Sequence, residues 1–243
     1  MIILLFICFL FLIGSMFGWV LEVFFRRFLA HENVEKRWIN PGFLTGPYLP
    51  LYGFGLCFLY FIASLDAYLP SDKPALSAAI LFVVMMLCMT LLELIAGKIF
   101  IVGMKVKLWD YSNEWLNYKG IVCPKYSLFW GLLGIVYYVL IHPYIRNAVM
   151  WLAQNLAFSF FVGMFFGVFA VDIFYSFNVV AKIRNAAIEN GVIVRYEELK
   201  YQIREVTARS KMKFRFWLAF KTPLTLKEHI LKYIERQTVN KNS

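Results

Sequence analysis

Three acidic residues lie inside long apolar segments of this chain: Glu22, Glu93 and Asp172. Placing an acid in a membrane helix costs roughly 2.5–3.5 kcal/mol, so such a residue is kept where it pairs or binds. Glu22 is four residues before Arg26, whereas Asp172 is ten residues before Lys182, or about 15 Å along a helix. Asp172 is therefore the deepest acid and has no cation in reach on its own segment. We expect it to meet a basic residue from a loop, to be protonated, or to bind a ligand.

A fourth acid, Asp110, lies in the polar connection Lys107-Leu-Trp-Asp-Tyr-Ser-Asn113. We expect this connection to fold back against the helix ends, so that Glu22, Glu93 and Asp110 converge on one pocket open to the cytoplasm. Such a pocket suits a cationic solute or a proton, and Asp172 should face the bundle interior. The predicted site residues are Glu22, Glu93, Asp110 and Asp172, with Trp19, Tyr52, Trp109 and Trp130 as walls.

Ordinary pairing is an alternative for each of these acids. Glu22 and Arg26 have the spacing of an ion pair on one helix face. Glu93 can pair with Lys98 or with a neighbouring helix. Asp110 can close a turn by bonding to the nearby backbone. The sequence leaves these alternatives open.

Two segments that precede apolar stretches are rich in Pro and Gly: residues 40–55 and 120–134. Irregular backbone at membrane depth must be buried in protein or line a polar cavity, because lipid cannot bond to it. Interrupted helices of this kind hold the sites of many transporters. The alternative is that a proline in the first turn simply starts a helix well.

Five apolar segments position these residues, in a chain with 61% hydrophobic residues and a mean hydropathy of +0.64. We predict an all-α, multi-pass membrane protein with a transmembrane domain at 1–181 and a basic cytoplasmic tail at 182–243. Three connections hold 23 of the 25 Lys and Arg residues. Because basic connections stay in the cytoplasm, the N-terminus should be outside and the C-terminus inside. The predicted spans are about 2–25, 47–65, 75–97, 125–141 and 153–181.

The first four spans show signs of an internal repeat. At an offset of 78 residues, Gly42 aligns with Gly120 and Tyr52 aligns with Trp130. Each half also has a glutamate near the inner end of its first span. We therefore expect a parallel two-helix repeat, related by an axis along the membrane normal. The predicted halves are residues 1–65 and 75–143.

The tail carries 14 basic and 6 acidic residues. Its 210–221 segment mixes cations with aromatic residues, which is typical of a segment lying on an anionic inner leaflet. Thr225 and Glu228 fit a capping box that would open a helix to about Gln237. Nucleic-acid binding is the less favoured alternative, because the tail has no RNA-binding motif. The predicted membrane-surface residues are Lys211, Lys213, Arg215 and Trp217.

Other chemistry finds little support in the sequence. The four cysteines form no C-x-x-C pair, and the three histidines lie in different connections, so we expect no metal site and no cofactor. Ser112 and Ser127 have no nearby histidine that could activate them. The chain also has no phosphate-binding loop, so any ATPase would be a separate subunit.

Five motifs across residues 18–134 carry a resemblance to a known family. They are Gly18-Trp19-x-x-Glu22, Gly42-Phe-Leu-x-Gly46-Pro47-x-x-Pro50-x-Tyr52-Gly53-x-Gly55, Glu93-x-x-x-Gly97, Trp109-Asp110-Tyr111-Ser112 and Ser127-x-x-Trp130-Gly131-x-x-Gly134. Each motif alone is weak, but in combination they resemble the bacterial membrane proteins labelled ABC-transporter type IV, or CmpB-like. The resemblance implies a multi-pass protein of the bacterial plasma membrane and a permease-like role.

Two classes of function follow. The first is a permease-like transport component with a polar site facing the cytoplasm, working with a separate ATPase subunit. The second is a non-transporting membrane protein, either a scaffold that recruits partners through its tail or a lipid-acting enzyme. Self-association into a homo-oligomer is compatible with either class, and an enzyme is the least favoured.

Overall fold

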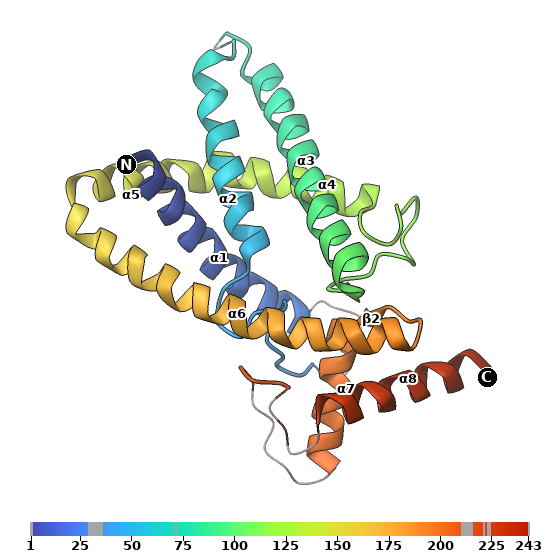
Figure 1. The fold of residues 1–243 in the computed structure, drawn as a ribbon. Helices are drawn as coiled ribbons and strands as arrows, with labels where there is room; N and C mark the ends of the chain where they lie inside the picture. Colours follow the sequence, from blue (N-terminus) through green and yellow to red (C-terminus); the bar gives the residue numbers. More distant parts are fainter. Residues whose placement is uncertain are drawn as a thin grey trace. The chain divides into compact units, whose positions relative to one another are not determined.

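The computed structural model describes residues 2–28, 36–70, 72–209, 216–220, 222 and 225–242, and helices make up most of this part (Figure 1). The α-helices are α1 (Ile2–Phe28), α2 (Pro50–Ala63), α3 (Pro74–Lys98), α4 (Pro124–Val136), α5 (His142–Gln154), α6 (Ser159–Glu189), α7 (Tyr196–Arg209) and α8 (Leu226–Asn242). Short 3₁₀ segments span Ser64–Tyr68 and Leu156–Phe158, π-helical segments span Ile99–Gly103 and Tyr137–Ile141, and two-residue strands form β1 (Val106–Lys107) and β2 (Val194–Arg195).

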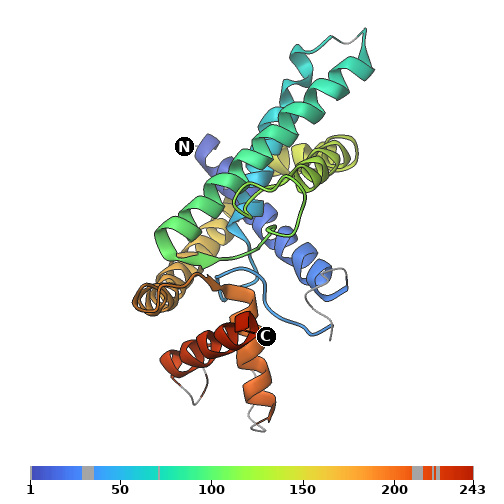
Figure 2. The same ribbon diagram turned by 90° about the vertical axis from the view of Figure 1, so that its right-hand side faces the viewer.

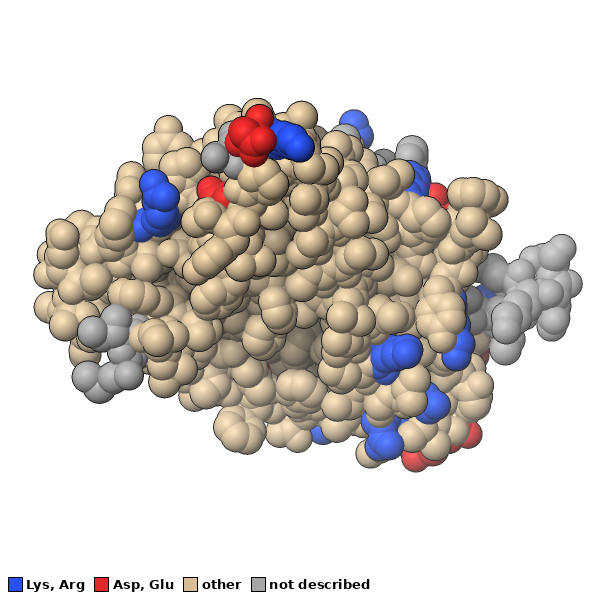
Figure 3. Space-filling model, turned by 90° about the horizontal axis from the view of Figure 1, so that it is seen from above, with Lys and Arg blue, Asp and Glu red and all other residues tan. Residues whose placement is uncertain are grey.

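Within the described residues, five helical stretches are long and apolar enough to cross a membrane, which confirms the predicted number. They leave large apolar side chains exposed along their length, as expected where lipid and not water is the solvent. Figure 3 shows a face on which uncharged residues predominate. The five stretches are Ile3–Phe28, Pro50–Tyr68, Pro74–Gly103, Pro124–Gln154 and Leu156–Glu189.

The fourth stretch is longer than the predicted 125–141. In a regular α-helix, Pro143 would clash with the carbonyl group four residues earlier. Instead the chain widens into a π-helical turn at Tyr137–Ile141, and Pro143 then occupies the first turn of α5. A π-turn relieves such a clash without ending the helix. The helical stretch therefore continues to Gln154 and includes Arg146.

The chain forms two compact units. The first comprises residues 1–19, 48–96 and 111–168, and the second comprises residues 20–47, 97–110 and 169–243. In the first unit, α2 and α3 run side by side as a hairpin, which is visible in Figures 1 and 2. Proline opens α2, α3 and α4, at Pro50, Pro74 and Pro124, because its fixed φ suits a first turn and its missing N–H is not needed there.

Helices α1 and α2 pack through a glycine. A Cβ built on Gly53 of α2 would lie 2.8 Å from the ring of Phe11 on α1. Helices α3 and α4 pack in the same way, since a Cβ on Gly131 would lie 2.7 Å from the ring of Phe82. Phe82 follows Phe11 by 71 residues, and Gly131 follows Gly53 by 78.

The next contact along each pair obeys the same two offsets. A Cβ on Gly14 would lie 2.6 Å from the Cβ of Leu56, and a Cβ on Gly134 would lie 2.9 Å from the Cβ of Met85. In this second contact the glycine lies on the first helix of one pair (Gly14 on α1) but on the second helix of the other pair (Gly134 on α4). The two pairs therefore pack in the same register, as expected of a duplicated helix hairpin. The direction of the axis that relates them stays a prediction.

Substituting either interface glycine should test this correspondence. Gly53→Ala and Gly131→Ala should each lower the free energy of unfolding by about 1–3 kcal/mol, because the added methyl group overpacks the helix contact. Gly163→Ala is the matched control, since nothing lies within 4 Å of its Cβ position. Thermal unfolding in detergent measures the difference. Equal melting temperatures for all three variants would contradict the shared packing.

The second unit has a core of its own. Val180 and Ile183 of α6 pack with Leu199 and Ile203 of α7 and with Ile230 of α8, all of them buried. Figures 1 and 2 show α7 and α8 crossing at this core. The short strands β1 and β2 pair in parallel, with Val106 opposite Val194. Both valines belong to this core.

Helix α8 begins as the sequence predicted. The backbone N–H of Thr225 donates to the Glu228 carboxylate at 2.7 Å, and the N–H of Glu228 donates to the Thr225 hydroxyl at 3.3 Å. This reciprocal pair is the expected capping box. The bond from the Thr225 N–H lowers the pKa of Glu228. The helix extends to Asn242, beyond the predicted end near Gln237.

Candidate functional site

Asp172 of α6 binds the loop that precedes α2. The backbone N–H of Gly46 donates to its carboxylate at 2.7 Å, and the N–H of Thr45 donates at 3.1 Å. The hydroxyl groups of Thr45 and Ser176 donate to the same carboxylate at 2.6 and 2.8 Å. The residue Asp172 is 7% exposed, and these bonds offset the cost of removing its carboxylate from water. Sequence reasoning had considered a cation, a proton or a ligand, but not the backbone of this loop.

Local sequence explains the shape of the loop. The buried side chain of Asn40 donates to the carbonyl groups of Leu44 and Thr45 at 3.1 and 2.9 Å, which closes residues 40–45 into a turn. Gly42 has a φ of 71°, a conformation that favours glycine. With its carbonyl groups bound inside, the loop presents the amides of Thr45 and Gly46 to Asp172.

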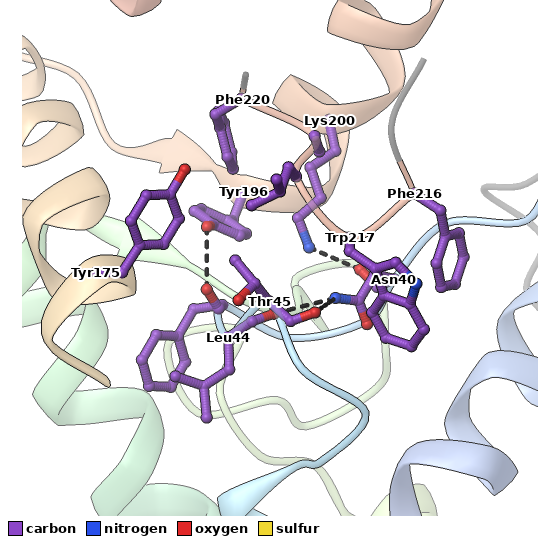
Figure 4. Close-up of a pocket in the computed structure, with 12 residues that line it drawn as sticks. Asn40, Leu44, Thr45, Tyr175, Tyr196, Lys200, Phe216, Trp217 and Phe220 are labelled. Carbon is purple, nitrogen blue, oxygen red and sulfur yellow. Dashed lines mark hydrogen bonds between the residues drawn. The ribbon is translucent and has the colours of Figure 1, made fainter. Parts of the chain in front are cut away.

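Lys200 of α7 binds the beginning of the same loop (Figure 4). Its ammonium group donates to the carbonyl of Asn40 at 2.7 Å and to the carbonyl of Gly42. Only 3% of the residue is exposed. This burial lowers the pKa of Lys200 from 10.5 to about 8, and the attraction of Glu197 offsets the effect only in part. We call Asp172, Lys200 and residues 40–46 the loop clamp.

An ion-pair chain extends the loop clamp to the end of α1. Arg26 pairs with Glu22 at 2.7 Å, which confirms the alternative of a helix-spaced pair. The same guanidinium group contacts Glu197 at 3.2 Å. Glu197 in turn lies 3.5 Å from the ammonium group of Lys200. Glu22 is therefore engaged in holding Arg26.

Asp110 joins the two short strands. It pairs with Lys107 at 3.0 Å and with Arg195 at 2.9 Å, so it connects the end of β1 to the end of β2. Arg195 also donates to the Glu198 carboxylate at 2.7 Å, and this bond raises the pKa of Arg195. Trp109, beside Asp110, is half-buried.

Glu93 lies in the first unit with two aromatic donors. The hydroxyl of Tyr111 donates to it at 2.9 Å and the indole N–H of Trp130 donates at 3.1 Å. The ring of Tyr52 meets the Trp130 ring edge to face, with centroids 5.8 Å apart. Tyr111 therefore folds back onto the end of α3, as the sequence predicted for its segment. Trp19, on α1 of the same unit, is half-buried.

The predicted site residues thus fall into separate groups. Glu93 shares a cluster with Tyr52 and Trp130 in the first unit. In the second unit Glu22, Asp110 and Asp172 each bind a different set of partners. The convergence of Glu22, Glu93 and Asp110 on one pocket stays a prediction.

A small cavity lies beside the loop clamp. Its volume is about 20 Å³, which is room for roughly one water molecule, so it is no solute site in this conformation. Trp217 lines it, whereas Lys211, Lys213 and Arg215 lie outside the described residues. Among the described residues, no three potential metal ligands lie close enough to share an ion. The cavity is lined by Asn40, Phe43, Leu44, Thr45, Tyr175, Tyr196, Lys200, Phe216, Trp217, Leu218, Ala219 and Phe220 (Figure 4).

Sequence reasoning missed Lys200, although a signal was present. Tyr196, Leu199 and Ile203 occupy the buried face of α7, at helical spacing. Lys200 falls on that same face, where a cation is expensive unless it is bonded. A search for lysines at core positions of amphipathic helices would therefore have identified Lys200.

Comparison with known proteins gave one result. The model of a protein family described as "Putative ABC-transporter type IV" matches residues 9–177. No curated protein and no solved structure matched the chain. The matched region contains every acid discussed above except Glu197, Glu198 and Glu228 of the C-terminal helices.

Proposed function

The chain belongs to this ABC-transporter type IV family, and on that premise we propose that it is the permease-like, membrane-spanning component of a transport system. In this proposal the loop clamp is its cytoplasm-facing polar site. A separate ATPase subunit supplies the energy, because the chain carries no phosphate-binding loop of its own. The protein resides in the bacterial plasma membrane.

One observation carries the proposal: the loop of residues 40–46 is held at both ends by elements far away in sequence. Asp172 binds the amides at its end and Lys200 binds the carbonyl groups at its beginning. The irregular backbone at a span entrance is thereby bonded within the protein, which is the arrangement that transporters use at their sites.

The length of α6 supports a coupling role for the loop clamp. Its 31 residues extend about 46 Å, more than the roughly 30 Å of a hydrocarbon core. One continuous helix therefore carries both Asp172, which binds the loop, and Ile183, which lies further along the helix and packs in the core with α7 and α8. A displacement of α7 would pull on the loop through Lys200, and the chain continues from the loop directly into α2.

The orientation should be measured first. In a variant without native cysteines, an impermeant thiol reagent added to intact cells should label Lys73→Cys and Arg146→Cys. It should label Arg37→Cys, Glu114→Cys and Lys232→Cys only after the membrane is opened, because the basic connections are cytoplasmic. Labelling of Lys232→Cys in intact cells would overturn the sidedness.

The function can be tested on the complex from native membranes. The full chain should purify together with an ATPase subunit whose ATP turnover depends on it. Asp172→Asn should lower this turnover about tenfold while the complex stays assembled, because the loop loses one of its two anchors. Asp72→Asn, at an exposed acid, is the control. Purification without any ATPase activity, or unchanged turnover in Asp172→Asn, would contradict the proposal.

A second candidate is the non-transporting scaffold. The observation that favours it is the core that α7 and α8 form with the last part of α6, which gives a partner a folded surface. A scaffold predicts that partners remain bound to the purified chain and that no ATP turnover depends on Asp172. The same experiment therefore separates the two functions.

A further inference from the structure

The last turns of α1 carry two consecutive arginines with different surroundings. Arg26 turns into the protein, where Glu22 and Glu197 hold it. Arg27, about 100° further round the helix, instead reaches a cluster of exposed aromatic side chains. Its guanidinium carbon lies 4.2 Å from the ring centroid of Trp38.

The aromatic cluster forms a surface at the end of the first span. Trp38 meets Phe24 and Phe28 edge to face, with ring centroids 5.7 and 6.2 Å apart. All three large side chains stay exposed, by 39% for Trp38, 50% for Phe24 and 55% for Phe28. Aromatic residues with this exposure gather where a membrane meets water, because their rings suit the headgroup level.

Arg27 keeps unused hydrogen-bonding capacity. One of its terminal nitrogens donates to the carbonyl of Lys36, but its buried Nε–H has no partner in the described part of the chain. No carboxylate among those residues pairs with it either. A guanidinium group offers five donors in a planar fork that fits two oxygens of a phosphate.

The position and charge of this surface select its occupant. Arg27 follows the predicted first span, about 2–25, by two residues, and we therefore place it at the depth of the lipid phosphates. Lys36 and Arg37 follow on the same loop and add positive charge. A basic cluster at the cytoplasmic side of a span attracts anionic lipids.

We propose that Arg27 and Trp38 form a binding site for an anionic glycerophospholipid of the inner leaflet. The guanidinium fork binds the phosphate group through its terminal nitrogens, and Trp38 holds the fork in place by stacking. Phe24 and Phe28 contact the upper part of the acyl chains. The site does not depend on transport, although its leaflet follows from the proposed orientation.

Lipid-dependent stabilisation tests the site. The full chain, purified in detergent and stripped of lipid, is titrated with phosphatidylglycerol, with phosphatidylcholine or with inorganic phosphate, and its melting temperature is followed. Phosphatidylglycerol should raise the melting temperature at lower concentrations than phosphatidylcholine. Inorganic phosphate should have no effect, because it brings no acyl chains to the aromatic surface.

Variants localise the effect. Arg27→Gln should raise the half-saturating concentration of phosphatidylglycerol about tenfold. Arg27→Lys, which keeps the charge but loses the fork, should raise it less. Arg146→Gln, at an exposed arginine of another span, is the matched control and should behave as the parent protein. Because each variant is compared with and without lipid, a general loss of stability does not produce this pattern.

Trp38→Leu provides an independent check, since it keeps Arg27 and removes only the stacking partner. It should also weaken phosphatidylglycerol binding. Unchanged binding in both Arg27→Gln and Trp38→Leu would overturn the site. Equal effects of phosphatidylcholine and phosphatidylglycerol would overturn its preference for anionic lipid, and an equal effect of inorganic phosphate would overturn the lipid assignment.

Discussion

Asp172→Ala is expected to lower the free energy of unfolding by about 3 kcal/mol and to release the loop before α2. The reason is that the amides of Thr45 and Gly46 lose their acceptor in a buried place. Each buried donor left without a partner costs about 1–3 kcal/mol, and a backbone amide cannot rotate away to find another. The hydroxyl groups of Thr45 and Ser176 can reorient, so they add less.

Thermal unfolding in detergent measures this loss, which corresponds to a fall of about 6–12 °C for a chain of this size. Asp172→Asn should lose about half as much, because its amide oxygen still accepts from one of the two N–H groups. Asp72→Asn, at an exposed acid, should stay within about 0.5 kcal/mol of the parent. An Asp172→Ala variant that melts with the parent protein would mean that the loop is held by other contacts.

The membrane helices could be predicted because apolar length is a local property. Five runs of apolar residues are visible without any knowledge of the fold, and the part of the chain that the structure describes has five matching stretches. The fourth helical stretch continues past residue 141 and through Pro143, although a proline usually marks a helix boundary. A π-turn at Tyr137–Ile141 accommodates it, and no residue pattern announces such a turn.

Contacts of the acids could be predicted only where the partner is near in sequence. Glu22 and Arg26 are four residues apart, and that pair was among the alternatives. The donors to Glu93 lie 18 and 37 residues away, and those to Asp172 lie up to 127 residues away. Trp130 was predicted as one wall of a pocket that includes Glu93, but its hydrogen bond to Glu93 was not predicted.

The partner of Asp172 escaped prediction for a chemical reason. A search for charged or ligand-binding side chains does not count backbone amides as partners. Yet a loop of Pro and Gly at membrane depth has amides that no helix satisfies, and a buried carboxylate is a natural acceptor for them. The two unusual features of the sequence, the breaker-rich segment and the deep acid, therefore bind each other.

Lys200→Met should change both the stability and its dependence on pH. Methionine fills much of the same space but leaves the carbonyl groups of Asn40 and Gly42 without their donor, which should cost about 1–3 kcal/mol at pH 7. The exposed Lys232→Met in α8 is the control and should have little effect.

The pH dependence follows from the pKa of Lys200, which is about 8 in the folded chain and 10.5 as its usual value. Between pH 8 and 10.5 the unfolded chain binds a proton that the folded chain does not, so the parent protein gains stability as pH rises. From pH 8 to 10 this gain is about 2–3 kcal/mol relative to Lys200→Met.

Above pH 10 the tyrosines of the second unit oppose this gain. Burial raises the pKa of Tyr233 to about 12 and also raises the pKa of Tyr196 well above its usual value, so the folded chain keeps protons that the unfolded chain loses. Tyr233 is present in the variant as well, so its effect cancels when the parent and Lys200→Met are compared. The centroid of the Tyr196 ring lies 4.7 Å from the Lys200 ammonium group, so the comparison is kept at or below pH 10, before the tyrosines dominate. Denaturation of the two proteins at pH 7, 8, 9 and 10 should therefore give a difference that widens steadily with pH. A difference in unfolding free energy that stays constant with pH would show that Lys200 keeps its ordinary pKa. The ammonium group of Lys200 would then not be buried against the loop.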